Sequence, residues 1–317
     1  MHRVFVCNEL PEPIVEPLAD IGEFSIWPGP GPIPRHRLVR EVAGCDGILT
    51  MLTTPVDAGV LAASPELRVV SQMAVGVDNI DLVACAARGI QVGHTPGVLT
   101  NAVADTAFAL LASVARRLPE GAAVVREGRW GPWDPWEMLG RELYQMTIGI
   151  VGMGRIGTAV AKRAAGFEMR VLYAAPSEKN VAGSERVEMD ELLARSDAVV
   201  LAAPLVDDTY HLIDAEALGL MRPEAYLVNV ARGGLIDTDA LVSALESGGI
   251  AGAALDVTEP EPLPSDHPLL GLSNCLVVPH IGSASTRARA DMAALAVENL
   301  IAGLLGRPMP AAYPLRE

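Results

Sequence analysis

The sequence has little positive charge. Its 317 residues include 24 lysines and arginines against 39 aspartates and glutamates, which gives a formal net charge of −15. Nucleic-acid phosphates are bound by clusters of lysine and arginine, so this balance disfavours a nucleic acid as partner, and an anionic membrane surface with it. A small anionic ligand remains compatible, because one arginine and a few backbone amides can reverse the field inside a cleft.

Cysteines and long apolar runs are also scarce. The four cysteines are far apart and form no Cys-x-x-Cys pair, which disfavours zinc ribbons and thioredoxin-type sites, and no metal ligands are expected. No run of about 18 apolar residues predicts a membrane span. Glu9 and the prolines after it follow the first apolar segment too soon for a signal peptide. With so few cysteines, we expect a protein of the reducing cytoplasm.

The chain does have strand-like apolar segments that alternate with helical segments, and this alternation predicts an α/β fold with parallel βαβ units. The length predicts two domains. The first series of expected strands comprises residues 3–7, 47–52, 67–72 and 90–92. The second series predicts a six-stranded doubly wound sheet from residues 147–151, 169–174, 198–202, 225–229, 252–256 and 274–278.

The segments between and after these series set the expected domain boundaries. Apolar spacing predicts a long helix over residues 102–118, ended by Pro119, and a loop over 129–139 that holds three of the four tryptophans. A second long helix is expected over residues 286–305, and residues 309–315 are expected to return to the first half. We therefore predict one domain of residues 1–98 and 288–317, and another of residues 99–287, with hinges near Val98 and Ser285.

A glycine loop joins the strand at 147–151 to a helix at 158–165. In Gly152-Met153-Gly154-Arg155-Ile156-Gly157, the first glycine allows a tight turn, Gly154 allows close approach to a pyrophosphate, and Gly157 allows helix and strand to pack closely. The helix N-terminus then offers N–H groups to the phosphates. The loop predicts a dinucleotide-binding domain.

The residue expected to read the cofactor's ribose is unusual. About 20 residues after such a loop an acidic side chain usually binds the ribose diol and repels a 2′-phosphate, but Ala175 occupies that position. Ser177 or Lys179 could contact the phosphate, whereas Glu178 argues against it. We expect NADP to be preferred, with NAD or dual specificity as the alternative.

Three polar side chains each follow a predicted strand end of this domain. Arg232 follows the strand at 225–229, Glu259 and Glu261 follow that at 252–256, and His280 follows that at 274–278. Ligands of open α/β sheets bind at the carboxyl ends of the strands. Each residue alone is ordinary, but together beside a nucleotide loop they indicate an active site.

These segments resemble the D-isomer-specific 2-hydroxyacid dehydrogenase family. The resemblance runs from Gly47 to Ser285 through the glycine loop, Asn229-Val-Ala-Arg-Gly-Gly234, Asp256-Val-Thr-Glu-Pro-Glu261 and Pro279-His-Ile-Gly-Ser283. It implies a Rossmann-type domain beside a smaller flavodoxin-like substrate domain, with the active site in the cleft between them.

The resemblance also implies roles for individual residues. The catalytic set falls on Arg232, Glu261 and His280, with Glu261 preferred over Glu259 because its spacing from Asp256 fits. Reduction of a 2-keto acid needs a proton at the carbonyl oxygen; His280 is expected to supply it, with Glu261 favouring the imidazolium form. The implied cofactor contacts are Gly152, Gly154, Arg155, Ile156, Gly157, Ala175, Pro204, Thr209, Val230, Ala231, Arg232, Asp256, His280 and Gly282.

The substrate side of the resemblance points to a small anionic acid. Residues 74–78 resemble the loop whose amides hold the substrate carboxylate, so Val75 and Gly76 are expected to bind substrate together with Arg232 and His280. Related phosphite dehydrogenases have a lysine where Val75 stands, which disfavours phosphite. Residues 133–136 are similar to a segment of glyoxylate and hydroxypyruvate reductases, where it lies near the dimer contact and the substrate pocket.

The predicted function is therefore NAD(P)H-dependent reduction of glyoxylate or hydroxypyruvate by a homodimer. Phosphoglycerate, D-lactate and 2-ketogluconate dehydrogenases remain alternatives within the family. A nucleotide-sensing corepressor or scaffold without catalysis is the alternative from another class, because relatives of that kind exist on this fold.

Overall fold

The computed structural model describes residues 1–315, and its internal contacts divide the chain into two compact units. The terminal unit comprises Met1–Leu99 and the chain from Ser285 onward, and the central unit comprises Thr100–Ala284. The substrate-binding and dinucleotide-binding roles assigned to them from the sequence remain predictions.

The terminal unit is built on a five-stranded parallel sheet with the order β2-β1-β3-β4-β5. This is the strand order of flavodoxin-like domains. The strands are β1 (His2–Val6), β2 (Gly22–Ile26), β3 (Gly47–Thr50), β4 (Val69–Gln72) and β5 (Gln91–Gly93). The sequence did not predict β2, because an edge strand buries only part of its residues and carries no continuous apolar run.

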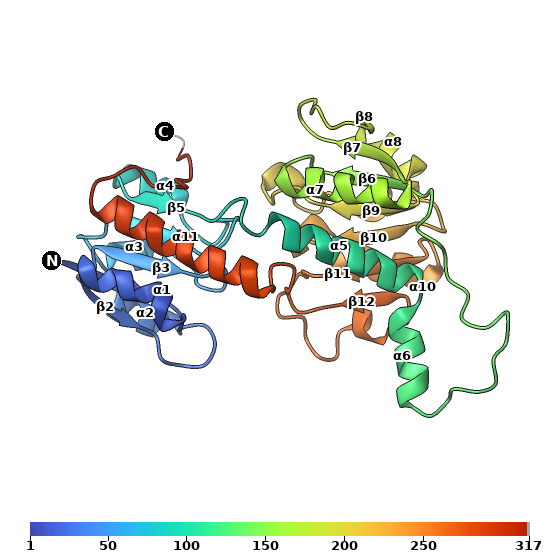
Figure 1. Cartoon of the computed structure of the whole chain (residues 1–317), viewed down its shortest axis with the longest axis horizontal. Coiled ribbons are helices and arrows are strands. Elements are labelled where there is room, and N and C mark those ends of the chain that lie inside the picture. Colours follow the sequence, from blue (N-terminus) through green and yellow to red (C-terminus); the bar gives the residue numbers. More distant parts are fainter. Residues whose placement is uncertain (316–317) are drawn as a thin grey trace. The chain divides into compact units, whose positions relative to one another are not determined.

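Helices cover both faces of this sheet (Figure 1). The long helix α11 (Thr286–Leu304) packs with α1 (Glu12–Val15) on one face, and Ser285 caps α11 by accepting a hydrogen bond from the Ala288 amide. The other face carries α2 (Arg35–Glu41), α3 (Ala58–Ala62) and α4 (Leu82–Ala87). The last described residues return to this unit as predicted, since the Tyr313 amide donates to the Val92 carbonyl at 2.7 Å.

The central unit is built on a seven-stranded parallel sheet with the order β12-β11-β10-β9-β6-β7-β8. This is a doubly wound order with one extra strand, and it confirms the predicted Rossmann-type class. The strands are β6 (Thr147–Val151), β7 (Arg170–Ala174), β8 (Ser184–Arg186), β9 (Ala198–Leu201), β10 (Tyr226–Asn229), β11 (Gly252–Leu255) and β12 (Cys275–Val277). The prediction of six strands was wrong because β8 is three residues long, polar and mostly exposed.

This sheet is also covered on both faces. One face carries α5 (Thr100–Ala115) and α7 (Arg155–Ala164), and the other carries α8 (Met189–Arg195), α9 (Ala215–Leu220) and α10 (Thr238–Ser247). The order reverses between β6 and β9, so the carboxyl ends of these two strands flank the crevice where such sheets bind ligands.

The expected helix over residues 102–118 is two helices in the structure. Helix α5 ends at Ala115, Arg117 turns the chain with a φ of 52°, and α6 (Leu118–Arg126) follows. Pro119 lies in the first turn of α6 and does not end a helix, because the first turn has no use for the N–H that proline lacks. Among residues 1–315, no helix is long and apolar enough to cross a membrane.

Candidate active site

The glycine loop lies at the carboxyl end of β6, beside the reversal of strand order. Gly152 adopts a φ of 94°, and a Cβ there would lie 2.7 Å from the Ala203 amide nitrogen. A Cβ on Gly157 would lie 2.1 Å from the Gly152 carbonyl oxygen, so the close contact of α7 with the loop requires glycine. Helix α7 begins at Arg155, three residues earlier than predicted, with Gly154 as its N-cap.

The same loop fits a pyrophosphate. A Cβ added to Gly154 would meet no atom within 4 Å, so the backbone at this position faces open space. The first amides of α7, from Arg155 onward, have no partner within the helix, as at any helix N-terminus, and can donate to a bound anion. The predicted contacts of Gly152, Gly154, Arg155, Ile156 and Gly157 with the cofactor are supported by this geometry and remain predictions.

Pro204 and Thr209, which were predicted to contact the cofactor, lie together in the loop after β9. The Thr209 hydroxyl donates to the Pro204 carbonyl at 2.8 Å and accepts from the Val206 amide at 2.9 Å. The threonine side chain therefore fixes the shape of this loop, which belongs to the strand that flanks the crevice.

The loop after β10 holds Arg232, and a buried asparagine shapes it. The Asn229 side chain donates from Nδ2 to the Arg232 carbonyl at 2.7 Å and accepts at Oδ1 from the Ala231 amide at 3.0 Å. Asn229 is fully buried, so both bonds form away from water. Sequence reasoning gave Asn229 no role, although a polar residue at the end of an apolar strand is the signal for one.

Close packing fixes the next part of this loop. A Cβ on Gly233 would lie 2.0 Å from the Thr258 carbonyl oxygen, so the Arg232 loop can pack against the loop after β11 only with glycine here. The Arg232 guanidinium donates to the Ala231 carbonyl at 2.8 Å. These contacts hold the Arg232 loop against the loop after β11, which carries Glu261.

His280 and Glu261 form a direct pair. His280 Nδ1 lies 2.7 Å from Glu261 Oε1, and both side chains are partly exposed. Burial alone would raise the pKa of Glu261, but the hydrogen bond and positive charge of His280 outweigh it. They hold that pKa below its ordinary value with help from the Thr258 amide and the Arg232 charge. The pair thus favours the ionised carboxylate of Glu261 beside the His280 ring.

Asp256 positions the segment that carries His280. Its carboxylate is buried and accepts from the Ile281 amide at 2.7 Å and the Gly282 amide at 2.8 Å. Its carbonyl accepts from the His280 amide at 2.8 Å. Burial raises the pKa of Asp256, while the two amide bonds act in the opposite direction. The predicted cofactor contacts of Asp256 and Gly282 remain predictions. In the structure, the Gly282 amide is bound to the Asp256 carboxylate.

Glu259, the rejected alternative to Glu261, has a different partner. Its Oε2 lies 3.2 Å from Nε2 of His211, a residue that the sequence analysis did not consider. The His211 amide donates to the Gly234 carbonyl at 2.8 Å, so this second pair joins the loops after β9, β10 and β11. The structure therefore supports Glu261 as the partner of His280.

The predicted substrate residues Val75 and Gly76 lie in the terminal unit, in the loop after β4. The Val75 carbonyl oxygen lies 3.0 Å from His94 Nδ1, and the Gly76 carbonyl accepts from Gln72 Nε2 at 3.3 Å. With both carbonyls engaged inside the unit, the loop has a defined shape. Its binding of a substrate carboxylate remains a prediction.

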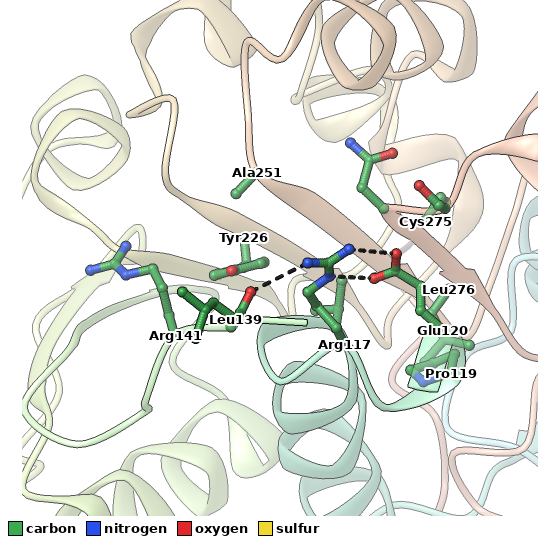
Figure 2. Close-up of a pocket in the computed structure, with 13 residues that line it drawn as sticks. Arg117, Pro119, Glu120, Leu139, Arg141, Tyr226, Ala251, Cys275 and Leu276 are labelled. Carbon is green, nitrogen blue, oxygen red and sulfur yellow. Dashed lines mark hydrogen bonds and ion pairs between the residues drawn. The ribbon is translucent and has the colours of Figure 1, made fainter. Parts of the chain in front are cut away.

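A pocket of about 400 Å³ in the central unit lies elsewhere (Figure 2). It is lined by residues at the starts of β10, β11 and β12, such as Tyr226 and Cys275, so it lies at the sheet edge opposite to the one that holds Arg232 and His280. Arg117 in its wall is paired with Glu120 at 2.7 Å. This pocket is separate from the nucleotide loop.

Comparisons with known proteins agree with the fold and the glycine loop. A family model for the D-isomer specific 2-hydroxyacid dehydrogenase, NAD binding domain, matches residues 108–282. The glyoxylate reductase of Korarchaeum cryptofilum is 48% identical over 314 residues, which cover 97% of this chain and 94% of that protein. The crystal structure of the TT0316 protein from Thermus thermophilus has a TM-score of 0.94 and 46% identity, covering 98% of this chain and 100% of that chain.

A further solved structure is similar and carries ligands. It is the NADPH-dependent glyoxylate/hydroxypyruvate reductase from Sinorhizobium meliloti in complex with NADP and malonate. It has a TM-score of 0.85 and 31% identity, covering 100% of this chain and 98% of that chain. The family model spans more than half of the chain, and the relatives are similar over nearly all of it. The chain therefore belongs to the D-isomer-specific 2-hydroxyacid dehydrogenase family.

Proposed function

We propose that this chain reduces glyoxylate or hydroxypyruvate to the corresponding 2-hydroxy acid, of the D form where the product is chiral, with NAD(P)H. The observation that carries the proposal is the His280–Glu261 pair, 2.7 Å apart, on the same sheet edge as the glycine loop. Relatives of similar sequence bear the name glyoxylate reductase, and a structural neighbour bears the name glyoxylate/hydroxypyruvate reductase.

A nicotinamide cofactor bound at the glycine loop would supply the hydride for the carbonyl carbon of the keto acid. His280 gives the proton that the carbonyl oxygen needs. Its Nδ1 is held by Glu261, so Nε2 is the nitrogen from which the proton leaves. The Glu261 carboxylate stabilises the imidazolium before transfer and fixes the orientation of the ring.

Arg232 acts on the substrate's negative charge. A guanidinium can pair with the keto acid's carboxylate and polarise its carbonyl through the same planar set of donors. The hydrogen bonds of Asn229 to the Arg232 carbonyl and the Ala231 amide fix the loop that presents it. Preorganised charge of this kind lowers the barrier because it needs no rearrangement during the reaction.

The cofactor side of the proposal is NADPH in preference to NADH. Ala175 follows the end of β7, where an acid would repel a 2′-phosphate. The similar enzyme from Sinorhizobium meliloti is named NADPH-dependent, which supports the same choice here. Steady-state kinetics with both cofactors tests it: we expect a higher kcat/KM for NADPH, and a strong preference for NADH would contradict it.

The reaction itself is tested by following NADPH and NADH oxidation with a panel of 2-keto acids. We expect the highest kcat/KM with glyoxylate or hydroxypyruvate. Faster turnover of pyruvate, 2-ketogluconate or phosphohydroxypyruvate would assign the chain to another activity of the family. Tight cofactor binding without turnover of any of them would favour the corepressor or scaffold function.

We also propose that the enzyme is a homodimer whose contact includes the loop of residues 129–139, here called the tryptophan loop. Trp130, Trp133 and Trp136 are 77%, 85% and 80% exposed in the single chain. Aromatic side chains are enriched where subunits meet, because burying them removes a large apolar area from water.

A further inference from the structure

The segment after β7 is held in a fixed shape at both ends. The Tyr173 hydroxyl accepts from the Lys179 amide at 2.9 Å and donates to the Lys179 carbonyl at 3.2 Å. At the near end, the Ala175 carbonyl accepts from Arg186 Nε at 3.1 Å. Residues 175–179 therefore form a preset loop next to the position from which this fold reads the adenosine ribose.

Arg186 reaches this loop from β8, the short strand that the sequence did not predict. Strands β7 and β8 are parallel, and Tyr173 and Arg186 are register partners, so the arginine lies beside the end of β7. Its Nε is used by the Ala175 carbonyl. Among residues 1–315, its two terminal nitrogens have no hydrogen bond or ion pair.

The neighbouring charges leave Arg186 available for an anion. Glu185, the nearest acid in sequence, is paired with Arg170 at 2.7 Å and with Arg195 at 3.2 Å. Arg186 Nε contacts only the backbone carbonyl of Ala175, whose side chain has no charge that could pair with the guanidinium. A planar guanidinium with two adjacent free donors matches the geometry of a phosphate.

We propose that Arg186 is the residue that binds the 2′-phosphate of NADPH and so sets the cofactor preference of this enzyme. The proposal rests on the NADPH preference proposed above. The Nε bond to Ala175 orients the guanidinium, the terminal nitrogens hold two phosphate oxygens, and the missing acid at position 175 removes the repulsion. The sequence pattern alone does not reveal this residue, because it lies on the neighbouring strand and outside the loop after β7.

The direct test is calorimetric binding of the cofactor fragments 2′,5′-ADP and ADP, which differ only in the position of one phosphate group. We expect the wild-type enzyme to bind 2′,5′-ADP more tightly. Arg186→Gln should weaken the binding of 2′,5′-ADP about tenfold or more, which is the range for a charge-assisted contact, and should change the binding of ADP little. Arg186→Lys keeps the charge but loses the planar pair of donors, so its affinity for 2′,5′-ADP should lie between those of the wild type and Arg186→Gln.

Arg170→Gln is the matched control. This arginine begins β7, at the opposite end of the strand from Ala175, and is engaged by Glu185, so its loss should leave the ratio of the two affinities unchanged. The kcat/KM ratio of NADPH to NADH should fall in Arg186→Gln and not in the control.

Two results would overturn the proposal: equal binding of 2′,5′-ADP and ADP by the wild type, or equal weakening of both fragments by Arg186→Gln. Fragment binding involves no keto acid. If the proposed reaction were wrong, the fragment result would therefore still stand. If the assignment of Arg186 were wrong, the enzyme would still turn over 2-keto acids.

Discussion

At His280, the backbone as well as the side chain is constrained. The residue has a φ of 52°, in the left-handed region that residues other than glycine rarely adopt. Its amide is bound to the Asp256 carbonyl, and the next two amides are bound to the Asp256 carboxylate. A rare conformation held by several bonds at a candidate active site is consistent with a ring that must point in one direction.

The pH dependence of reduction should reveal the charge of Glu261. Its pKa is lowered in the folded enzyme, so the carboxylate persists as pH falls to the ordinary value of about 4.3 and is lost only below it. Glu261→Gln removes this charge at every pH. We expect kcat/KM to fall about tenfold or more near neutral pH, and the wild type's loss of activity on protonation of Glu261, below its ordinary pKa, to be absent from the variant.

Glu259→Gln is the control for that profile, because Glu259 is bound to His211 and not to His280. Its profile should stay close to that of the wild type. An equal loss of kcat/KM in both variants, or none in Glu261→Gln, would contradict the assignment of Glu261.

Cofactor choice should respond to a single charge at position 175. Ala175→Asp introduces an acidic side chain at the position where such a side chain usually binds the ribose diol and repels a 2′-phosphate. We expect kcat/KM for NADPH to fall about tenfold or more, with NADH retained or improved. Steady-state kinetics with both cofactors measures this, and an unchanged ratio would show that the cofactor's ribose lies elsewhere.

At the scale of elements, the site depends on how closely three loops at the sheet edge pack. Gly233→Ala places a Cβ 2.0 Å from the Thr258 carbonyl oxygen, and the loops of Arg232 and Glu261 must then separate. We expect a loss of about 1–3 kcal/mol in the free energy of unfolding, measured in urea, together with a lower kcat.

Gly219→Ala in α9 is the control for this substitution. A Cβ there meets nothing within 4 Å, and alanine in a helix should leave stability unchanged or raise it by about 0.5–1 kcal/mol. If Gly233→Ala behaved like this control, the proposed packing of the two loops would be wrong.

The elements predicted best from the sequence were the buried strands. Strand β6 was predicted with its observed bounds, because a strand buried on both faces is a continuous apolar run. Strands β2 and β8 were missed because edge strands pair on one side and carry exposed residues. The pairing of His280 with Glu261 followed from spacing and resemblance, whereas the roles of Asn229, His211 and Arg186 depend on contacts between loops or strands that no local pattern encodes.

At the scale of the whole molecule, the tryptophan loop should determine assembly. Replacing both Trp133 and Trp136 with alanine should convert a dimer into a monomer, because each is more than 75% exposed in the single chain and gains its burial only from a partner. Analytical ultracentrifugation measures this. Val83→Ala, at an exposed apolar residue of α4, is the control and should leave the dimer intact.

The substitution Trp136→Ala alone separates the two roles that the sequence left open. A changed ratio of kcat/KM between glyoxylate and hydroxypyruvate would place this residue at the substrate. A changed oligomeric state with the same substrate ratio would limit it to subunit packing. A wild-type enzyme that is monomeric at all concentrations would contradict the proposed dimer.

The most direct test of the central claim is turnover by His280→Ala, measured with glyoxylate and NADPH alongside calorimetric binding of NADPH. Loss of the general acid should lower kcat by about 10²-fold or more. Cofactor affinity should change little, because the glycine loop proposed to hold the pyrophosphate follows β6, whereas His280 follows β12. Turnover near the wild-type rate, or an equal loss of turnover and cofactor binding, would contradict the role of His280 as the proton donor.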